Sequence, residues 1–223
     1  MYCVASGDLT LYSYVRALAL FSSKPYTSPV HAADGAVDLV PHLTNSSLQT
    51  HKGEEGVRLF DELLGCHILS GEESDVPGGG STLTVDHLEN IQDQIADVLA
   101  ETFKAALQSP IHFQVWLIFV KAMPILRNPQ PLANAFELYG VDFLIEHITS
   151  PQPQFQVKLL EMNAEPAVEL TGPRLTWVLE DLFNAIAHVC VGPFVRDVPV
   201  EAWPVGETRH HLRKCLETKV RGG

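Results

Sequence analysis

The sequence predicts an α+β fold in which helices flank a mainly antiparallel sheet. Three observations lead to this prediction: a tight β-hairpin at the N-terminus, a long amphipathic helix, and two strand-like apolar runs in the second half of the chain. Strand, helix, strand pair and helix follow one another without an internal repeat, an order typical of mixed α+β domains. With 223 residues, 46% of them hydrophobic, the chain is long enough to bury a core.

The first predicted element is the hairpin. Tyr2–Ser6 and Leu9–Tyr14 are rich in β-branched and aromatic residues and lie on either side of Gly7-Asp8. This pattern is typical of two antiparallel strands joined by a tight turn. Leu18–Ser22 is a candidate third strand. Residues 22–38 are rich in Ser, Pro, Gly and Ala, so we expect an irregular loop there.

Two helices are predicted next. Glu54–Leu64 has apolar residues at helical spacing and is interpreted as a short amphipathic helix. The clearest helical pattern is Leu88–Leu107, where apolar residues recur every three or four positions. Thr84 or Asp86 could cap the start of that helix, because both side chains can accept a hydrogen bond from its first backbone N–H groups.

The sequence of the second half of the chain predicts a strand pair, a helix and a C-terminal tail. Phe136–Ile145 and Phe155–Met162 are expected to pair across a polar connection, and Leu175–Val191 has the apolar spacing of a second long helix. Residues 195–223 are interpreted as a C-terminal tail. The basic cluster Arg209–Lys214 within it is expected to lie on a solvated terminal helix.

Composition excludes some function classes. The chain has 15 Lys and Arg against 27 Asp and Glu, a net charge of −12, so we expect no direct nucleic-acid binding, which needs clustered basic residues. The apolar run Val115–Val120 is too short to span a bilayer, so no membrane partner is expected. No CxxC pair occurs among the four cysteines, which are Cys3, Cys66, Cys190 and Cys215. Free thiols favour a cytoplasmic or nuclear location.

The candidate chemistry lies on the predicted strand pair. Glu161 and Asn163 are two residues apart, so their side chains would project from the same face of a strand. Asp142 interrupts the apolar strand expected to pair with it. Two converging carboxylates and an amide oxygen are suitable ligands for magnesium, which prefers oxygen and keeps several waters. The alternative is that Asp142 and Glu161 lie near strand ends and simply face solvent.

Three segments together carry a family resemblance. Phe136–Leu144 (FELYGVDFL) and Leu159–Ala167 (LLEMNAEPA) resemble the two signature strands of the tubulin–tyrosine ligase family, and His42–Gln49 (HLTNSSLQ) resembles its His-Leu-Thr-Asn motif. They occur in the family's order, and the resemblance extends over residues 2–194.

Two longer tracts, Gly56–Ser70 and Leu170–Phe194, are most similar to fungal members of this family. In those members the ligase domain follows a SurE-like phosphatase domain, in a protein associated with mRNA-processing bodies. The resemblance therefore implies a cytoplasmic location that could include these bodies.

The resemblance implies an ATP-grasp fold and an ATP-dependent ligase. ATP would phosphorylate a carboxylate of an acceptor protein, and the amine of an amino acid would attack the acyl phosphate. By motif match, Asp142, Glu161 and Asn163 would hold Mg²⁺ against the ATP phosphates. Thr44 and Asn45 would lie near the nucleotide; in the alternative interpretation they only stabilise a turn. The acceptor would be a C-terminal or side-chain carboxylate, with tubulin as the family's example and a tyrosine or glutamate type of amino acid added.

The sequence also departs from the family pattern. The strands that carry the phosphate-binding lysine, the adenine clamp and a basic arginine would precede Tyr2, so we expect only the C-terminal portion of the domain, inactive alone or supplying half a site. Arg16 is the nearest candidate for a catalytic arginine. Residues 115–130 are interpreted as an insertion within a partial domain spanning 1–194, and a translated intron is one hypothesis for it.

Two other functions remain open. A non-catalytic scaffold or interaction module of ribonucleoprotein bodies would keep the fold without the chemistry. A hydrolase has little support, because the sequence has no Gly-x-Ser-x-Gly elbow. The amino acid added and the acceptor protein are not fixed by any residue.

Overall fold

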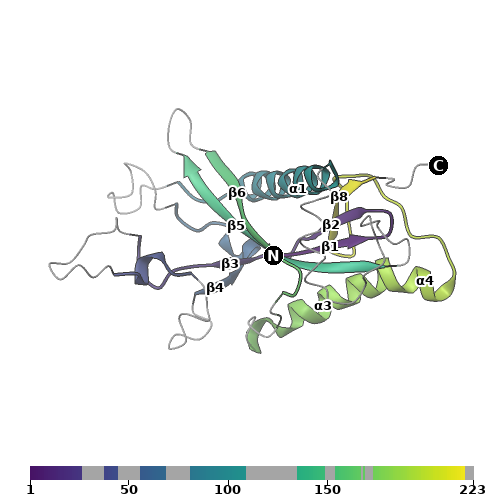
Figure 1. Ribbon diagram of the computed structural model, residues 1–223. Helices are drawn as coiled ribbons and strands as arrows, with labels where there is room; N and C mark the ends of the chain where they lie inside the picture. The colour runs from purple at the N-terminus through teal and green to yellow at the C-terminus, as the bar shows by residue number, and fades with distance from the viewer. Residues whose placement is uncertain are drawn as a thin grey trace.

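The computed structural model describes residues 1–26, 38–44, 56–68, 81–108, 135–148, 154–166, 168 and 173–218. These residues form a six-stranded sheet, in the order β6-β5-β1-β2-β8-β7, with helices on both faces (Figure 1). Every neighbouring pair of strands in it is antiparallel. The predicted α+β class with a mainly antiparallel sheet is confirmed. The predicted insertion at 115–130 lies outside the described residues.

The main sheet comprises β1 (Tyr2–Ser6), β2 (Thr10–Tyr14), β5 (Phe136–Ile148), β6 (Gln154–Asn163), β7 (Thr208–Arg209) and β8 (Leu212–Glu217). A small second sheet comprises β3 (Leu18–Leu20) and β4 (Val57–Leu59). The helices are α1 (Val85–Gln108), α3 (Thr176–Ile186) and α4 (Gly192–Arg196). Short helical turns are η1 (Val40–His42), η3 (Phe60–Leu63), η6 (Pro173–Leu175) and the π-helical η7 (Ala187–Val191). The N-terminal hairpin and the β5–β6 pair are confirmed, and the third strand forms but belongs to the small sheet.

Helix α1 covers one face of the sheet. Its buried residues Ile91, Ile95 and Leu99 pack in one core with Tyr139 and Val141 of β5. The predicted cap is also confirmed: the His87 N–H donates to the Thr84 hydroxyl at 3.3 Å, and the Thr84 N–H donates to the His87 ring at 3.2 Å. This exchange binds backbone donors that the start of a helix would otherwise leave free.

The α3–η7–α4 segment covers the other face of the sheet (Figure 1). Val178, Leu182 and Ile186 are buried there against Val4 of β1 and Tyr12 of β2. The predicted long helix is therefore confirmed, with one π-helical turn in its path. The 24 residues Pro173–Arg196 contain an 18-residue window with a mean hydropathy of 1.4, so the segment is also long and apolar enough to cross a membrane. That is weak evidence for a span, because a helix packed on a core meets the same criterion.

The prediction of a short helix at Glu54–Leu64 is wrong. Val57–Leu59 instead forms β4, which pairs antiparallel with β3, and only Phe60–Leu63 is helical, as a 3-10 turn. Val57 and Leu59 are buried while Arg58 between them is exposed, which is the period of a strand. Tertiary pairing with β3 thus outweighs a helical pattern that was too short to be decisive.

The prediction of a solvated terminal helix at Arg209–Lys214 is also wrong. These residues form the β7–β8 hairpin, and β8 pairs with β2 inside the main sheet. Leu212 and Lys214 are almost fully buried. Without β8, strand β2 would be an exposed edge of the main sheet. Pairing with β2 therefore stabilises β8, and composition alone does not reveal this pairing.

The β7–β8 turn offers a stability prediction. His210 and His211 connect the two strands with φ of 50° and 60°, so both occupy the left-handed region. A two-residue hairpin turn of this kind favours glycine at its second position. We expect His211→Gly to raise the free energy of unfolding by about 1 kcal/mol. Gly206→Ala should lower it by a similar amount, because Gly206 has φ of 93°. Urea unfolding checks both, and a loss of stability in His211→Gly would contradict the strain argument.

Candidate metal and nucleotide site

The predicted metal ligands lie on one face of the β5–β6 pair. Asp142 stands directly opposite Glu161, and Gly140 stands opposite Asn163. Directly opposed residues of antiparallel strands share a face, as do residues two apart on one strand. The neighbouring residues Tyr139 and Val141 point into the core beneath α1. The three polar side chains therefore project from the face opposite α1, as their spacing predicts. Their role in binding metal stays a prediction.

Backbone irregularities surround this set. The β5–β6 register shifts between Asp142 and Phe143, which marks a β-bulge, and bulges are common beside active sites because they re-aim side chains. A Cβ on Gly140 would lie 2.9 Å from the Cβ of Pro166. Only glycine therefore allows the chain after β6 to fold back over β5 at this point.

The two carboxylates face each other with no lysine or arginine of the described residues between them. Asp142 and Glu161 are exposed, and the Asn163 amide donates to Glu161 Oε1 at 3.2 Å. Among the described residues, no lysine or arginine forms an ion pair with either carboxylate; the nearby Lys158 is bound to Glu146. Burial lowers the pKa of the Met1 amine, and the negative charge of Asp142 opposes that shift. Like charges directly opposite on paired strands repel each other, so a cation at this point would relieve the repulsion.

The residues present fit magnesium. The described part of the chain has no group of three or more His, Cys, Asp and Glu side chains that could hold a metal ion. A site here would consist of two carboxylates, the Asn163 amide oxygen, and ligands from outside the chain. Magnesium takes such a set, because it is usually bound by one or two carboxylates together with waters and substrate phosphates. The exposure of Asp142 and Glu161 leaves room for those outer ligands.

Arg16 lies just beyond β2 and is held by α3. Its Nε donates to Asp181 Oδ2 at 2.9 Å, and its guanidinium lies 4.8 Å from the centre of the Trp177 ring. Its Nη2 is 3.3 Å from His211 Nε2. These contacts orient Arg16 toward α3 and the β7–β8 turn rather than toward the acidic set. A catalytic role for Arg16 stays a prediction.

Sequence reasoning missed Asp181 as the residue that fixes Arg16. Asp181 also accepts a hydrogen bond from the Tyr14 hydroxyl at 2.7 Å. Burial, and then the hydrogen bond to Asp181, raises the pKa of Tyr14, which keeps this hydroxyl protonated. The available signal was a carboxylate interrupting the apolar 175–191 helix pattern, the same signal that singled out Asp142 on its strand.

Of the two predicted nucleotide contacts, Thr44 lies within the described residues. Thr44 is exposed and follows η1. Asn45 lies outside the described residues. Within the same motif, His42 makes an edge-to-face contact with Tyr26, with ring centres 5.3 Å apart. No contact among the described residues joins Thr44 to the acidic set.

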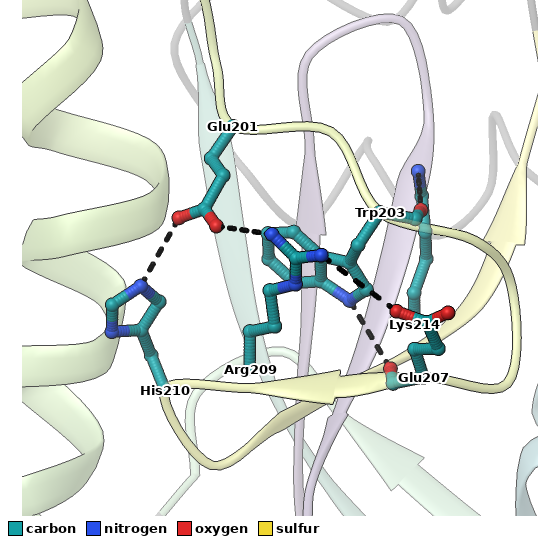
Figure 2. Close-up of polar contacts among 6 residues, drawn as sticks. All are labelled: Glu201, Trp203, Glu207, Arg209, His210 and Lys214. Atoms are coloured by element: carbon teal, nitrogen blue, oxygen red, sulfur yellow. Dashed lines mark hydrogen bonds and ion pairs between the residues drawn. The ribbon is translucent and has the colours of Figure 1, made fainter.

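A second polar constellation, which sequence reasoning also missed, lies at the β7–β8 hairpin (Figure 2). Trp203 is 3% exposed, packs on Tyr12 with ring centres 5.2 Å apart, and donates from Nε1 to the Glu207 carbonyl at 3.1 Å. Buried Lys214 donates to the Trp203 carbonyl at 2.7 Å and to Glu217 at 2.6 Å. The buried ammonium therefore has both partners that burial of a charge requires.

The rest of this constellation is exposed and paired. Glu201 lies between Arg209, at 2.6 Å, and His210, at 3.2 Å, as Figure 2 shows. Hydrogen bonds, first from Arg209 and then from His210, lower the pKa of Glu201. The His210 ring also stacks on that of His188 at 5.3 Å. Because each of these charges already has a partner, the constellation joins the hairpin to η7 and offers no open ligand set.

The chain is similar in sequence to proteins of one family. The model of the "Tubulin-tyrosine ligase family" matches residues 1–198. The probable tubulin–tyrosine ligase PBY1 of Saccharomyces cerevisiae is 33% identical over 201 residues, covering 88% of this chain and 22% of that protein. The probable tubulin–tyrosine ligase C12B10.04 of Schizosaccharomyces pombe is 28% identical over 194 residues, covering 86% of this chain and 37% of that protein.

One solved structure is similar over nearly the whole chain. It is the C-terminal domain of K. lactis Pby1, described as an ATP-grasp enzyme that interacts with the mRNA decapping enzyme Dcp2. Identity is 28% and the TM-score is 0.56, covering 98% of this chain and 46% of that one. The fold therefore matches this ATP-grasp domain. The chain spans less than half the length of each of these relatives.

Proposed function

This chain belongs to the tubulin–tyrosine ligase family, and on that premise we propose that it supplies the metal-binding part of an ATP-dependent carboxylate–amine ligase. The observation that supports the proposal most is the cross-strand pair of Asp142 and Glu161, with Asn163 on the same face. A complete reaction would need further residues to enclose the nucleotide. We propose that this chain acts as half of a site.

In this proposal Asp142, Glu161 and Asn163 would hold Mg²⁺ at the β5–β6 face. When bound, the ion would neutralise charge that develops on the transferred phosphoryl group. The chain itself positions the ligands. The paired strands fix the two carboxylates opposite each other, and Gly140 lets Pro166 pack beside them. Rigid placement of this kind lets binding energy stabilise the transition state instead of ordering loose side chains.

Arg16, Thr44 and Asn45 are assigned supporting roles. Arg16 uses Nε for Asp181 and Nη2 for His211, which leaves other N–H groups of its guanidinium for a phosphate or an acceptor carboxylate. Its stacking on Trp177 fixes the plane of the guanidinium in advance. We assign Thr44 and Asn45 hydrogen bonds to the nucleotide or the acceptor.

The proposed substrates are an amino acid of the tyrosine or glutamate type and a protein that presents a C-terminal or side-chain carboxylate. Tubulin is the acceptor that the relatives' names suggest. Dcp2, the stated partner of the K. lactis relative, is proposed as a protein partner. We propose a cytoplasmic location that includes mRNA-processing bodies, which the interaction of the K. lactis relative with Dcp2 supports.

A scaffold function is the second candidate, and a specific observation favours it. On the segment that includes α3 and α4, Phe183 is 50% exposed, Phe194 64% and Val195 72%. Large apolar side chains that are exposed on one segment are candidates for a protein–protein interface. A scaffold would bind its partner with unchanged affinity when the Asp142 and Glu161 carboxylates are removed, whereas a ligase would lose turnover.

The test is ADP formation by a longer protein that joins this chain to the part of a relative that the chain does not cover. ATP, Mg²⁺, a labelled amino acid and an acceptor extract are combined. We expect ADP release that depends on both amino acid and acceptor, together with labelling of a protein. If ADP formation is independent of every amino acid tested and no protein is labelled, the ligase proposal is wrong and the scaffold function stands.

A further inference from the structure

A glutamine side chain occupies part of the outer edge of β6. Gln94 of α1 donates from Nε2 to the Phe155 carbonyl at 2.9 Å, and its Oε1 accepts the Val157 N–H at 3.1 Å. One amide thus bonds a carbonyl and an N–H two residues apart on the same strand. One residue of an added parallel strand would make the same pair of bonds through its own N–H and C=O groups. The edge of β6 is therefore shaped to accept an external amide.

Beyond Val157 the edge is open in the part of the chain that the structure describes. Strand β6 is the last strand of the sheet order, and it continues from Lys158 to Asn163. At about 3.3 Å per residue this stretch is roughly 20 Å long, enough for a short extended peptide. It ends at Asn163, and Glu161 of the proposed metal set lies within it.

We propose that the acceptor binds by adding an extended segment as a strand along Lys158–Asn163, with its carboxylate beside Glu161. This rests on the proposed ligase function, which supplies the reason for a carboxylate in the partner. Backbone pairing holds the segment independently of its sequence. Because Gln94 already bonds the Phe155 carbonyl and the Val157 N–H, the segment pairs beyond Val157, on the side of the acidic set.

The edge favours a peptide over a second copy of the chain. Pairing β6 with β6 of another copy would bring two sets of Asp142 and Glu161 together, on chains that each carry a net charge of −12. An extended peptide brings no such set. Leu160, which is 62% exposed beside Glu161, offers an apolar contact for one of its side chains.

Backbone pairing and the contact of the peptide carboxylate differ in their dependence on a cation. A peptide carboxylate beside Asp142 and Glu161 would be repelled by both unless a divalent cation lies between them. Backbone pairing, in contrast, needs no cation. A neutral extended peptide should therefore bind with or without Mg²⁺, and a free carboxylate should help only when Mg²⁺ is present.

The probes are three six-residue peptides of alternating serine and valine: one with an amidated C-terminus, one with a free carboxylate, and one amidated and N-methylated at consecutive residues, which removes N–H donors from both edges of the peptide. Each is titrated into the ¹⁵N-labelled chain. We expect the amidated peptide to shift amide signals of β6, and N-methylation to weaken binding at least tenfold, since it removes N–H donors. Absence of shifts on β6, or equal binding of the N-methylated peptide, would overturn the docking proposal.

Two variants separate this proposal from the ligase proposal. Gln94→Ala should let a nine-residue amidated peptide bind more tightly than it binds the original chain. The change frees the Phe155 carbonyl and the Val157 N–H, which Gln94 otherwise bonds, for pairing with the peptide. Glu89→Ala, an exposed change on the same helix, should have no effect. Asp142→Ala should abolish the Mg²⁺-dependent gain of the carboxylate peptide and leave the amidated peptide unaffected. If amidated peptides bind and the carboxylate never gains from Mg²⁺, strand docking stands and the metal site fails.

Discussion

Replacing Trp203 with alanine is expected to lower the free energy of unfolding by about 3–5 kcal/mol, the usual cost of emptying a large aromatic site in a core. Trp203 is 3% exposed, packs on Tyr12 of β2, and lies beside the ammonium of Lys214, with that nitrogen 5.9 Å from the ring centre. The change removes the contact to β2 and lets water reach a buried charge whose two hydrogen bonds depend on the same hairpin.

Urea unfolding followed by circular dichroism measures this effect. The matched control is Trp177→Ala, because Trp177 is 40% exposed and contacts Arg16 on the surface of α3. That control should cost about 1 kcal/mol or less. Equal losses for the two variants would show that the β7–β8 hairpin does not form part of the core.

Replacing Asp142 or Glu161 with alanine is expected to weaken Mg²⁺-dependent ATP binding by the longer protein at least about 100-fold, since a bound metal contributes several kcal/mol of charge stabilisation. ATP binding in EDTA should not change. The physical reason is that either change removes one of the two carboxylates, and with it one negative charge and one oxygen ligand of the ion. Calorimetry with and without EDTA measures the difference.

The control for this prediction is Glu146→Ala. Glu146 is an exposed carboxylate on the same strand, already paired with Lys158. Its removal should leave ATP affinity within about twofold, because it lies outside the acidic set. Identical nucleotide affinity in Asp142→Ala and the unaltered chain would remove the basis for the metal site.

The elements with strong local patterns could be predicted from sequence. The Gly7-Asp8 hairpin, the α1 helix with its Thr84 cap, and the β5–β6 pair each follow from turn chemistry or from a long hydrophobic period. Two elements could not be predicted, because non-local pairing decides them. Strand β4 exists through β3, and β8 exists through β2, more than 190 residues away in sequence.

The candidate site divides in the same way. Asp142, Glu161 and Asn163 were predictable, since strand period alone places them on one face once the two strands pair. The contacts of Arg16 were not, because Asp181, Trp177 and His211 come from distant elements. Lys214 was misjudged for a related reason: a lysine in a basic cluster is usually solvated, and only the fold places Trp203 over this one.

The central claim is that one divalent ion binds between Asp142, Glu161 and Asn163. The most direct measurement is paramagnetic broadening by Mn²⁺, titrated at substoichiometric amounts into the ¹⁵N-labelled chain. We predict that amide signals around these three residues broaden first and that excess Mg²⁺ restores them. Broadening that begins instead at other exposed carboxylates, such as Glu101 of α1, with β5 and β6 unaffected, would contradict the claim.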